Sequence, residues 1–358
     1  MEEVVEITMG QSPSSKNYTN NSSDHILVQG NADMKNGHVE PRVWTTQITK
    51  QAKKGDLILS VRAPVGDIGK TDYDVVIGRG VAAIKGNEYI FQVLIKMKDS
   101  GYWTRFSTGS TFESINSSNI RNAQIMIPKD DEQTKIAKVL TFLDNTIQLH
   151  ERKCEELALI KKALLQKLFP KKDEFKPEVR YKNFSDAWEQ RKLREVVERF
   201  DNLRIPVTSS KRKRGITPYY GANGIQDYVQ GYTHDGEFVL VAEDGANDLQ
   251  NYPIHYVNGK VWVNNHAHVL QGKKDIADNL FLVNAIKRIK FETYLVGGSR
   301  AKLNADVMMK LPIKIPKLNE QQKLGKYFSR IDSLIALHQR KLEKLKQLKK
   351  FLLQNMFI

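Results

Sequence analysis

Short loops rich in lysine, arginine, asparagine and histidine carry the clearest chemical potential in this sequence of 358 residues. Residues 211–214 place four cations in a row, and an aromatic turn follows at residues 219–224. Cationic side chains bind phosphate groups, whereas Asn, Gln and Arg can form bidentate hydrogen bonds with base edges. The pattern predicts DNA contacts in the second half of the chain at Lys211, Arg212, Lys213, Arg214, Tyr219, Tyr220, Asn223, Asn264, Asn265, His266, His268, Ser299, Arg300 and Lys302.

The first half of the chain carries a similar but sparser set of residues. It includes a polar loop at residues 108–111 and scattered arginines beside aromatic side chains. The predicted DNA contacts in this half are Lys16, Asn17, Tyr18, Arg42, Trp44, Arg62, Arg79, Ser110 and Thr111. For any single candidate in either half, an ordinary solvated surface residue is the alternative interpretation.

The overall charge supports a polyanionic partner such as double-stranded DNA. The chain has 56 Lys and Arg against 41 Asp and Glu, a formal net charge of +15. Cys154 is the only cysteine, which excludes an intramolecular disulfide and a zinc ribbon and fits a reducing cytoplasm. The sequence shows no signal peptide and no apolar stretch long enough for a membrane span, so we expect a soluble protein without a membrane partner.

Motifs for catalysis are weak. Gly78-Arg79-Gly80 follows a predicted strand, as in a dinucleotide-binding turn, but Gly86-Asn87 would interrupt the helix that such a turn must open. His266 and His268 lack an obvious set of further metal ligands. We therefore predict that the chain binds rather than catalyses, with no cofactor and no metal of its own.

An internal repeat organises the chain. Residues 127–169 match residues 315–357 without a gap, at an offset of 188, with 21 of 43 positions identical. A second match, Glu3–Glu6 with Glu195–Glu198, marks the start of each copy. The segments between these matches scarcely resemble each other, and their short β-branched runs separated by Gly, Asn and Pro predict strands.

The repeated segments predict two long helices. Each begins after a proline, Pro128 or Pro316, which ends a run expected to be a strand, at residues 123–127 or 311–315. Apolar residues then recur at spacings of three and four, so each helix has one apolar stripe. We expect the helices to pair as an antiparallel coiled coil; the alternative is that each packs on its own domain. His150 and His338 fall at equivalent positions, where they either set the register of the pair or lie on a solvated flank.

The predicted fold class is α+β, with two β-rich domains separated by the two paired helices and related by a pseudo-twofold repeat. The expected segments are a first domain at 1–128, a central helix at 129–170, a linker at 171–186, a second domain at 187–315 and a C-terminal helix at 316–358. The first copy lacks a counterpart of the lead-in at residues 181–194. We expect the first domain to be less stable, or to rely on its partner helices, if these residues complete the packing.

The chain resembles the specificity subunits of type I restriction-modification enzymes. The resemblance rests on two Ile-Pro-x-x-x-Glu-Gln segments that lead long helices, on the stretch Phe184–Leu193, and on Gly55–Arg62 and Ala242–Asn247. It implies that each β-rich domain is a target recognition domain for one half of a bipartite DNA site, and that the helices set the gap between the halves.

The resemblance also implies partners that hold the cofactors. Modification subunits, expected as two copies, would dock on the helices and methylate adenine with S-adenosylmethionine, and restriction subunits would supply ATP- and Mg-dependent cleavage. No catalytic residue is then expected in this chain, and the protein would act in the cytoplasm of a bacterium or archaeon, bound to the nucleoid through DNA. A coiled-coil scaffold with two protein-binding domains is the alternative, and a nucleotide-dependent enzyme that uses the turn at Gly78 is a further one.

Overall fold

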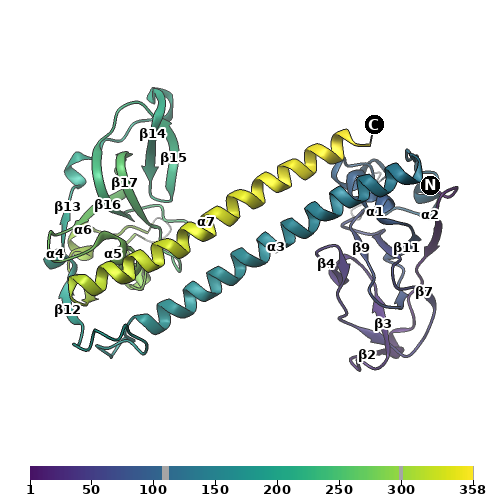
Figure 1. Cartoon of the computed structure of the whole chain (residues 1–358), viewed down its shortest axis with the longest axis horizontal. Coiled ribbons are helices and arrows are strands. Elements are labelled where there is room, and N and C mark those ends of the chain that lie inside the picture. Colours follow the sequence, from purple (N-terminus) through teal and green to yellow (C-terminus); the bar gives the residue numbers. More distant parts are fainter. Residues whose placement is uncertain (107–112, 298–300, 358) are drawn as a thin grey trace. The chain divides into compact units, whose positions relative to one another are not determined.

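The computed structural model describes residues 1–106, 113–297 and 301–357. The chain divides into two units: unit 1 comprises Met1–Arg152 and His338–Ile358, and unit 2 comprises Lys153–Leu337. The two long helices, α3 (Asp130–Leu168) and α7 (Leu318–Asn355), therefore each contribute one part to unit 1 and the other part to unit 2 (Figure 1). The expected α+β class is confirmed, because each unit combines β-sheet with helices. None of the described helices is long and apolar enough to cross a lipid bilayer.

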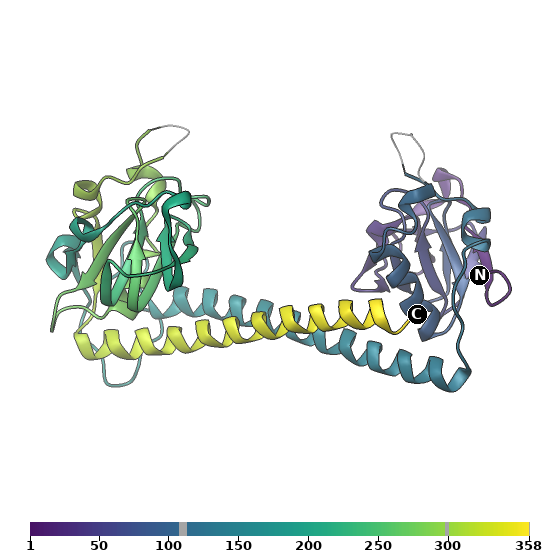
Figure 2. The same ribbon diagram turned by 90° about the horizontal axis from the view of Figure 1, so that it is seen from above.

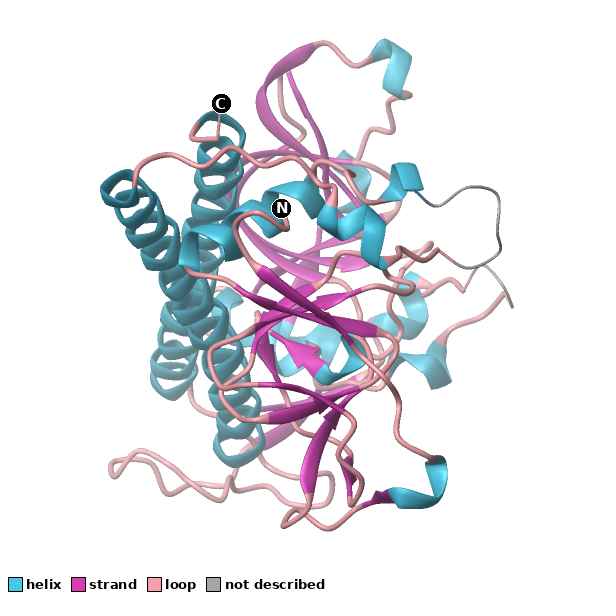
Figure 3. Ribbon diagram, turned by 90° about the vertical axis from the view of Figure 1, so that its right-hand side faces the viewer, coloured by secondary structure: helices cyan, strands magenta, loops and turns pink. Residues whose placement is uncertain are grey.

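Unit 1 contains two sheets of short strands. The first has the order β1-β11-β8-β9-β5-β4, formed by Glu6–Met9, Val81–Lys85, Leu57–Ser60, Ile68–Lys70, His38–Val39 and Met34–Lys35. The second has the order β2-β6-β3-β10-β7, formed by Tyr18–Thr19, Trp44–Thr45, His25–Val28, Val75–Ile77 and Lys50–Ala52. Figure 3 draws the strands in magenta and the helices in cyan. Helix α1 (Glu88–Asp99) buries Ile90 and Leu94 in one cluster with Leu57 and Ile84 of the first sheet, and the short helix α2 spans Ser117–Arg121.

Unit 2 is built on one sheet of longer strands. Its order is β13-β18-β16-β17-β14-β15, formed by Val197–Arg199, Ala267–Gly272, His234–Ala242, Ile254–Val263, Arg214–Gly221 and Gly224–Val229. Figure 2 shows these strands in teal and green. A separate pair joins β12 (Glu189–Lys192) to β19 (Pro312–Ile315). The α-helices are α4 (Leu193–Val196), α5 (Asn279–Ile286) and α6 (Ala305–Met308). Short 3-10 turns in the two units span Ser15–Asn17, Asn31–Asp33, Thr104–Phe106, Asp201–Leu203, Ser209–Lys211 and Phe291–Tyr294.

The two units share a topology that their sequences conceal. Strands β1, β11, β8 and β9 of unit 1 are successive antiparallel neighbours, and β13, β18, β16 and β17 of unit 2 are paired in the same way. A helix follows the second strand of each series, α1 after β11 and α5 after β18. The repeat therefore extends through the β-rich segments, although only the apolar character of the buried positions is kept there.

The long helices pair in an antiparallel manner, which confirms the predicted coiled coil. In unit 1, Lys349 of α7 pairs with Asp144 of α3, and in unit 2, Lys161 of α3 pairs with Asp332 of α7. These ion pairs are equivalent, because 144 and 332, like 161 and 349, differ by the repeat offset of 188.

Apolar burial contributes more than these ion pairs to helix pairing. In unit 1 Leu140 and Leu143 share a buried cluster with Leu353 and Phe357, and unit 2 repeats the arrangement. The equivalent residues there are Phe328, Ile331, Leu165 and Phe169. Each fully buried side chain of this size contributes roughly 1.5–3 kcal/mol, compared with roughly 0–1 kcal/mol for a solvated ion pair.

The Ile-Pro-x-x-x-Glu-Gln motif fastens each long helix to its own domain. Gln133 donates from Nε2 to the Pro128 carbonyl at 2.9 Å and accepts a hydrogen bond from Asn87, the N-cap residue of α1. Gln321 repeats both contacts, because it donates to the Pro316 carbonyl at 2.9 Å and accepts from the backbone amide of Asp278, the N-cap residue of α5. The glutamine thus links the start of one helix to the start of another.

The lead-in of unit 2 is a structural element. Strand β12 pairs with β19, and Trp188 is buried against Phe169. Arg180 binds the buried carboxylate of Glu320 through two nitrogens, at 2.8 and 2.7 Å.

Unit 1 has no strand at the corresponding segment, residues 124–127, so the prediction of a strand at 123–127 is wrong. A strand needs a hydrogen-bonded neighbour, and β12 has no counterpart among the described residues of unit 1. The prediction of a strand near residues 311–315 is confirmed by β19. The lower stability expected for the first domain stays a prediction.

His150 and His338 contact each other, with their Nδ1 atoms 2.7 Å apart and the ring centroids 4.9 Å apart. The interpretation of a polar pair at the helix seam is therefore confirmed, and the solvated-flank alternative is wrong. Partial burial, the neighbouring His338 and the charge of Lys341 together lower the pKa of His150. The folded protein consequently favours the neutral form of His150 more than the unfolded chain does.

This lowered pKa predicts a pH-dependent helix pair. A histidine whose pKa falls on folding contributes stability above its unfolded pKa of about 6.5, and this stability is lost as the pH falls below that value. We expect the double variant His150→Leu, His338→Leu to lose less thermal stability than the unmodified protein between about pH 7.5 and about pH 5.5. His25→Leu, at an exposed position, is the control, and an equal pH dependence of all three proteins would contradict the prediction.

Candidate nucleic-acid interface

The shared topology brings polar loops to the same place in both units. In unit 1 the amide of Val61, just after β8, donates to the Gly80 carbonyl, just before β11. In unit 2 the amide of Glu243, just after β16, donates in the same way to the His266 carbonyl, just before β18. Predicted DNA contacts therefore lie at equivalent ends of the two sheets: Arg62, Arg79, Asn265 and His266.

At this end of each sheet, a third segment of the chain forms a backbone bridge with the loop that follows β8 or β16. Arg62 forms a backbone bridge with Ser114 in unit 1, and Asp244 forms one with Lys302 in unit 2. Both bridges lie next to the polar loops singled out in the sequence. The candidates Ser110, Thr111, Ser299 and Arg300 themselves fall outside the described residues.

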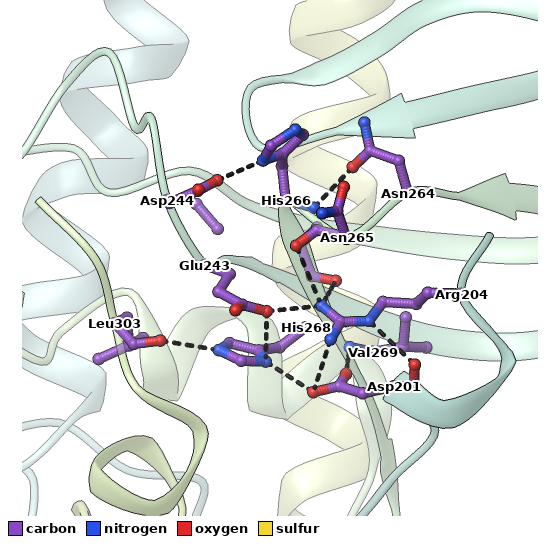
Figure 4. Close-up of polar contacts among 12 residues, drawn as sticks. Asp201, Arg204, Glu243, Asp244, Asn264, Asn265, His266, His268, Val269 and Leu303 are labelled. Atoms are coloured by element: carbon purple, nitrogen blue, oxygen red, sulfur yellow. Dashed lines mark hydrogen bonds and ion pairs between the residues drawn. The ribbon is translucent and has the colours of Figure 1, made fainter. Parts of the chain in front are cut away.

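A charged network fixes these loops in unit 2 (Figure 4). His268 is 1% exposed, and its Nε2 lies 2.9 Å from the Leu303 carbonyl, while its Nδ1 lies 2.7 Å from Oδ2 of Asp201. Both ring nitrogens of His268 thus lie within hydrogen-bonding distance of oxygen atoms from other elements. Arg204 donates to Glu243 at 2.7 Å and to the Ala267 carbonyl at 2.9 Å, so cations and carboxylates alternate through the network.

Burial and charge pairing act in opposite directions on the acidic members of this network. Burial by itself would raise the pKa of Asp201, but His268, the Val269 amide and Arg204 outweigh it, and the pKa lies below its ordinary value. The pKa of Glu243 is also lowered, because hydrogen bonds from Arg204 and Lys302 outweigh its burial. Both carboxyl groups are therefore held in the ionised form.

The network contains the carboxylate and imidazole groups of a metal site, but cationic side chains already bind its carboxylates. Oxygen and nitrogen atoms of Asp201, Glu243 and His268 all lie within 4.8 Å of one another, so carboxylates do converge on His268, which sequence reasoning missed. Arg204 and Lys302 bind the same carboxylates, and a further cation would have to displace them. We interpret the cluster as an ion network that positions the loops around it.

Three of the predicted DNA contacts have buried side chains, which does not favour direct contact with DNA: Tyr219, Asn264 and His268. The Tyr219 hydroxyl lies within 3.2 Å of both the amide nitrogen and the carbonyl oxygen of Val207, and Asn264 accepts a hydrogen bond from the His266 amide. The local sequence does not reveal that a polar loop residue is buried when its hydrogen-bond partner belongs to another element.

The basic segment at residues 211–214 contains both fixed and free cations. Arg212 donates to the Val207 carbonyl at 3.1 Å, and its guanidinium lies 4.0 Å from the ring centroid of Tyr219. Lys211, Lys213 and Arg214 are exposed, and within the described ranges their side chains have no ion pair. These three are the cations of this segment that remain available for phosphates.

The other candidates in unit 2 also differ in whether their side chains bind a partner within the unit. Asn223 is exposed, but its amide group bridges to Gly245 and Asn247 and so ties the β14–β15 turn to the loop after β16. His266 pairs with Asp244, and Lys302 pairs with Glu243 at 3.0 Å. Tyr220 is partly buried, and Asn265 is exposed.

Among the predicted contacts of unit 1, Lys16, Arg62 and Arg79 are exposed and have no ion pair in the part of the chain that the structure describes. Strand β11 follows Gly78–Gly80 directly, so this glycine turn opens a strand rather than the helix of a dinucleotide site. The remaining candidates have partners within unit 1. Arg42 donates to Ala32, Asn17 to Gln47 and Tyr18 to Gln29, and Trp44 is partly buried in β6.

Comparisons with known proteins agree with this architecture. A family model described as the type I restriction modification DNA specificity domain matches residues 1–159 and 185–347. A protein of Haemophilus influenzae named as a type I restriction enzyme specificity subunit is 48% identical over 149 residues, which cover 42% of this chain and 38% of that protein. The MjaX specificity subunit of Methanocaldococcus jannaschii is 31% identical over 173 residues, covering 47% and 40% of the two chains. The matches thus span about two fifths of the length of these two relatives.

Solved structures match along the whole chain. The S subunit of a type I restriction-modification system from M. genitalium has a TM-score of 0.77 at 16% identity, with 100% of this chain and 94% of that chain covered. A structure from a study of complex assembly and conformational transition of the type I system has a TM-score of 0.50 at 15% identity, with 99% and 96% covered. At these identities the matches establish the fold.

The ion network predicts a stability effect at Glu243. Glu243→Gln removes the charge that binds Arg204 and Lys302, and we expect the free energy of unfolding to fall by about 2 kcal/mol in urea titrations. Glu292→Gln, at an exposed position, should change it by less than about 0.5 kcal/mol. The difference should shrink on acidification, because a carboxyl whose pKa falls on folding contributes stability only above that pKa. Equal effects of the two substitutions would contradict the network.

Proposed function

The chain belongs to the type I restriction modification DNA specificity domain family, and we propose that its two units read the two halves of a bipartite site in double-stranded DNA. The observation that carries this proposal is the equivalence of the loop ends. Arg62 and Arg79 of unit 1 correspond in position to Asp244 and Asn265 of unit 2. In each unit, these two residues lie beside the ends of two neighbouring strands. One scaffold with different side chains at one place is what two readers of different half-sites require.

Two classes of contact would share the recognition. Arg62, Arg79 and Asn265 have side chains that form bidentate hydrogen bonds with base edges. Lys16, Lys211, Lys213 and Arg214 would neutralise phosphates and give affinity without sequence preference. The net charge of +15 supports this division.

The long helices would set the gap between the half-sites. Each helix runs without interruption from one unit into the other, and a helix of 39 residues is about 58 Å long at about 1.5 Å per residue. Pairing through Leu140, Leu143 and their repeat equivalents would keep the two helices in one register. A change in helix length would then change the gap and leave both half-sites alone.

Chemistry would reside in partner subunits, and this chain would be non-catalytic. We propose that modification subunits with S-adenosylmethionine methylate adenine and dock on the long helices, and that restriction subunits supply ATP- and Mg-dependent cleavage. Exposed apolar residues on the helices recur at the repeat offset: Val139 with Tyr327, Leu149 with Leu337 and Ile160 with Leu348. Exposed positions have no packing reason to stay apolar in both copies, so the repeat supports two equivalent docking faces and two modification subunits.

The proposed function is tested by expressing the chain with the modification and restriction genes that neighbour it and mapping methylated adenine by long-read sequencing. We expect one bipartite motif with a fixed gap. Replacement of residues 199–314 with the corresponding segment of a family member should change one half of the motif and keep the other half and the gap. No methylation motif, or a change in both halves, would contradict the proposal and favour a protein scaffold.

The docking faces are tested by native mass spectrometry of the copurified complex. Val139→Glu and Tyr327→Glu should each reduce the number of bound modification subunits from two to one, and the double variant should bind none, because each places a charge in one apolar face. Thr134→Glu adds the same charge at an exposed position about 140° around the helix from Val139 and is the matched control. Two bound subunits in the double variant would contradict this assignment.

A further inference from the structure

An isoleucine in the basic region of unit 2 lies almost entirely in solvent. Ile216, in strand β14, is 93% exposed, more than any other apolar side chain of comparable size in the described ranges. Leaving such a side chain in water forgoes the favourable free energy that an apolar residue gains when it is buried. Single exposed apolar residues are common, so the significance of Ile216 depends on the structure that presents it.

A β-bulge presents Ile216. Arg214 and Thr217 of β14 both pair with Val229 of β15, so Gly215 and Ile216 between them have no partner in the ladder. A bulge of this kind bends the strand and redirects side chains. A Cβ atom at Gly215 would lie 2.3 Å from the Val229 carbonyl oxygen, so the close approach of the two strands requires glycine there.

The base of the bulge is firmly held. Tyr219 is 1% exposed, and its hydroxyl bonds both backbone groups of Val207. Arg212 lies over the Tyr219 ring and also approaches Asp227 of β15 at 3.5 Å. Ile216 therefore projects from a fixed platform rather than from a loose loop.

Two unpaired cations lie close to the exposed isoleucine in the sequence. Lys213 and Arg214 precede Ile216 by three and two residues, both are exposed, and neither has an ion pair within the described ranges. An exposed aliphatic side chain next to phosphate-binding cations matches the way many proteins insert an apolar wedge between stacked base pairs. A protein partner with an apolar pocket would not need the cations, and a phosphate-only contact would not need the isoleucine.

We propose that Ile216 is a wedge that inserts between two base pairs of the DNA while Lys213 and Arg214 bind the adjacent phosphates. This inference rests on the proposed DNA-reading function and adds a contact with a different physical character. The wedge contributes affinity without charge and makes unit 2 sensitive to how easily a base step opens. Steps that unstack readily would be preferred at this position, independently of hydrogen bonds to base edges.

The test uses the complete complex with its modification subunits and a 2-aminopurine-labelled duplex that carries the motif to be identified by the methylation mapping described under the proposed function. Moving the 2-aminopurine through the half-site read by unit 2 should reveal one step where fluorescence rises on binding. Ile216→Ala should abolish that rise and weaken binding about tenfold, whereas Ile216→Leu should keep both. Ile225→Ala, at a 49% exposed isoleucine of β15, is the matched control and should behave like the unmodified protein.

Salt dependence separates the wedge from the phosphate contacts. Ile216→Ala should leave the slope of log affinity against log salt unchanged, while Arg214→Ala should reduce its magnitude by about one. Unchanged affinity and fluorescence in Ile216→Ala would overturn the wedge, and so would loss of the modification subunits with intact DNA binding. An unmodified complex without salt-dependent DNA binding would instead overturn the proposed function.

Discussion

In each unit, the antiparallel pairing of α3 with α7 covers apolar side chains that neither helix could bury alone. A single helix of about 40 residues with one apolar stripe is not stable in water, because its stripe needs a covering surface. The repeat supplies that surface from a second helix of nearly the same sequence. Asp144 with Lys349 and Lys161 with Asp332 recur at the same offset, and His150 meets its own equivalent, His338. The helix segment is thereby complementary to its own copy.

This constraint explains which parts of the sequence diverged and which did not. A substitution in a helix stripe must fit both its own domain and the other helix, so Leu164, Leu165 and Phe169 are identical to Leu352, Leu353 and Phe357. The sheets face no such double requirement. Their cores need apolar side chains of suitable volume, and their loops need only a fixed position. The loop after β8 in unit 1 and the loop after β16 in unit 2 could therefore change freely while the strands beneath them kept one order.

Sequence reasoning located the features that depend on local patterns. The helices, their pairing and the glutamine-containing motif follow from spacing and from the repeat, and the basic segment 211–214 is visible as composition. Sequence reasoning failed where the interaction partner of a residue lies far away in the chain. His268 forms its contacts with Asp201 and Leu303, which are 67 and 35 residues away in the sequence. The residues next to His268 in the sequence do not indicate these partners. The shared sheet topology was missed because buried strands require only apolar character, and Ile216 was missed because a bulge depends on the pairing of two strands.

Each unit contains one part of α3 and one part of α7, and this division has a consequence for biosynthesis. The core of unit 1 includes Leu353 and Phe357, so residues 1–152 leave the ribosome long before the segment that covers them has been made. Unit 2 is contiguous at residues 153–337 and contains its own helix halves, so it can complete its core first. The nascent chain would thus mature from the middle outward, and Leu140 and Leu143 would lack the cover of Leu353 and Phe357 until the C-terminal segment has been made.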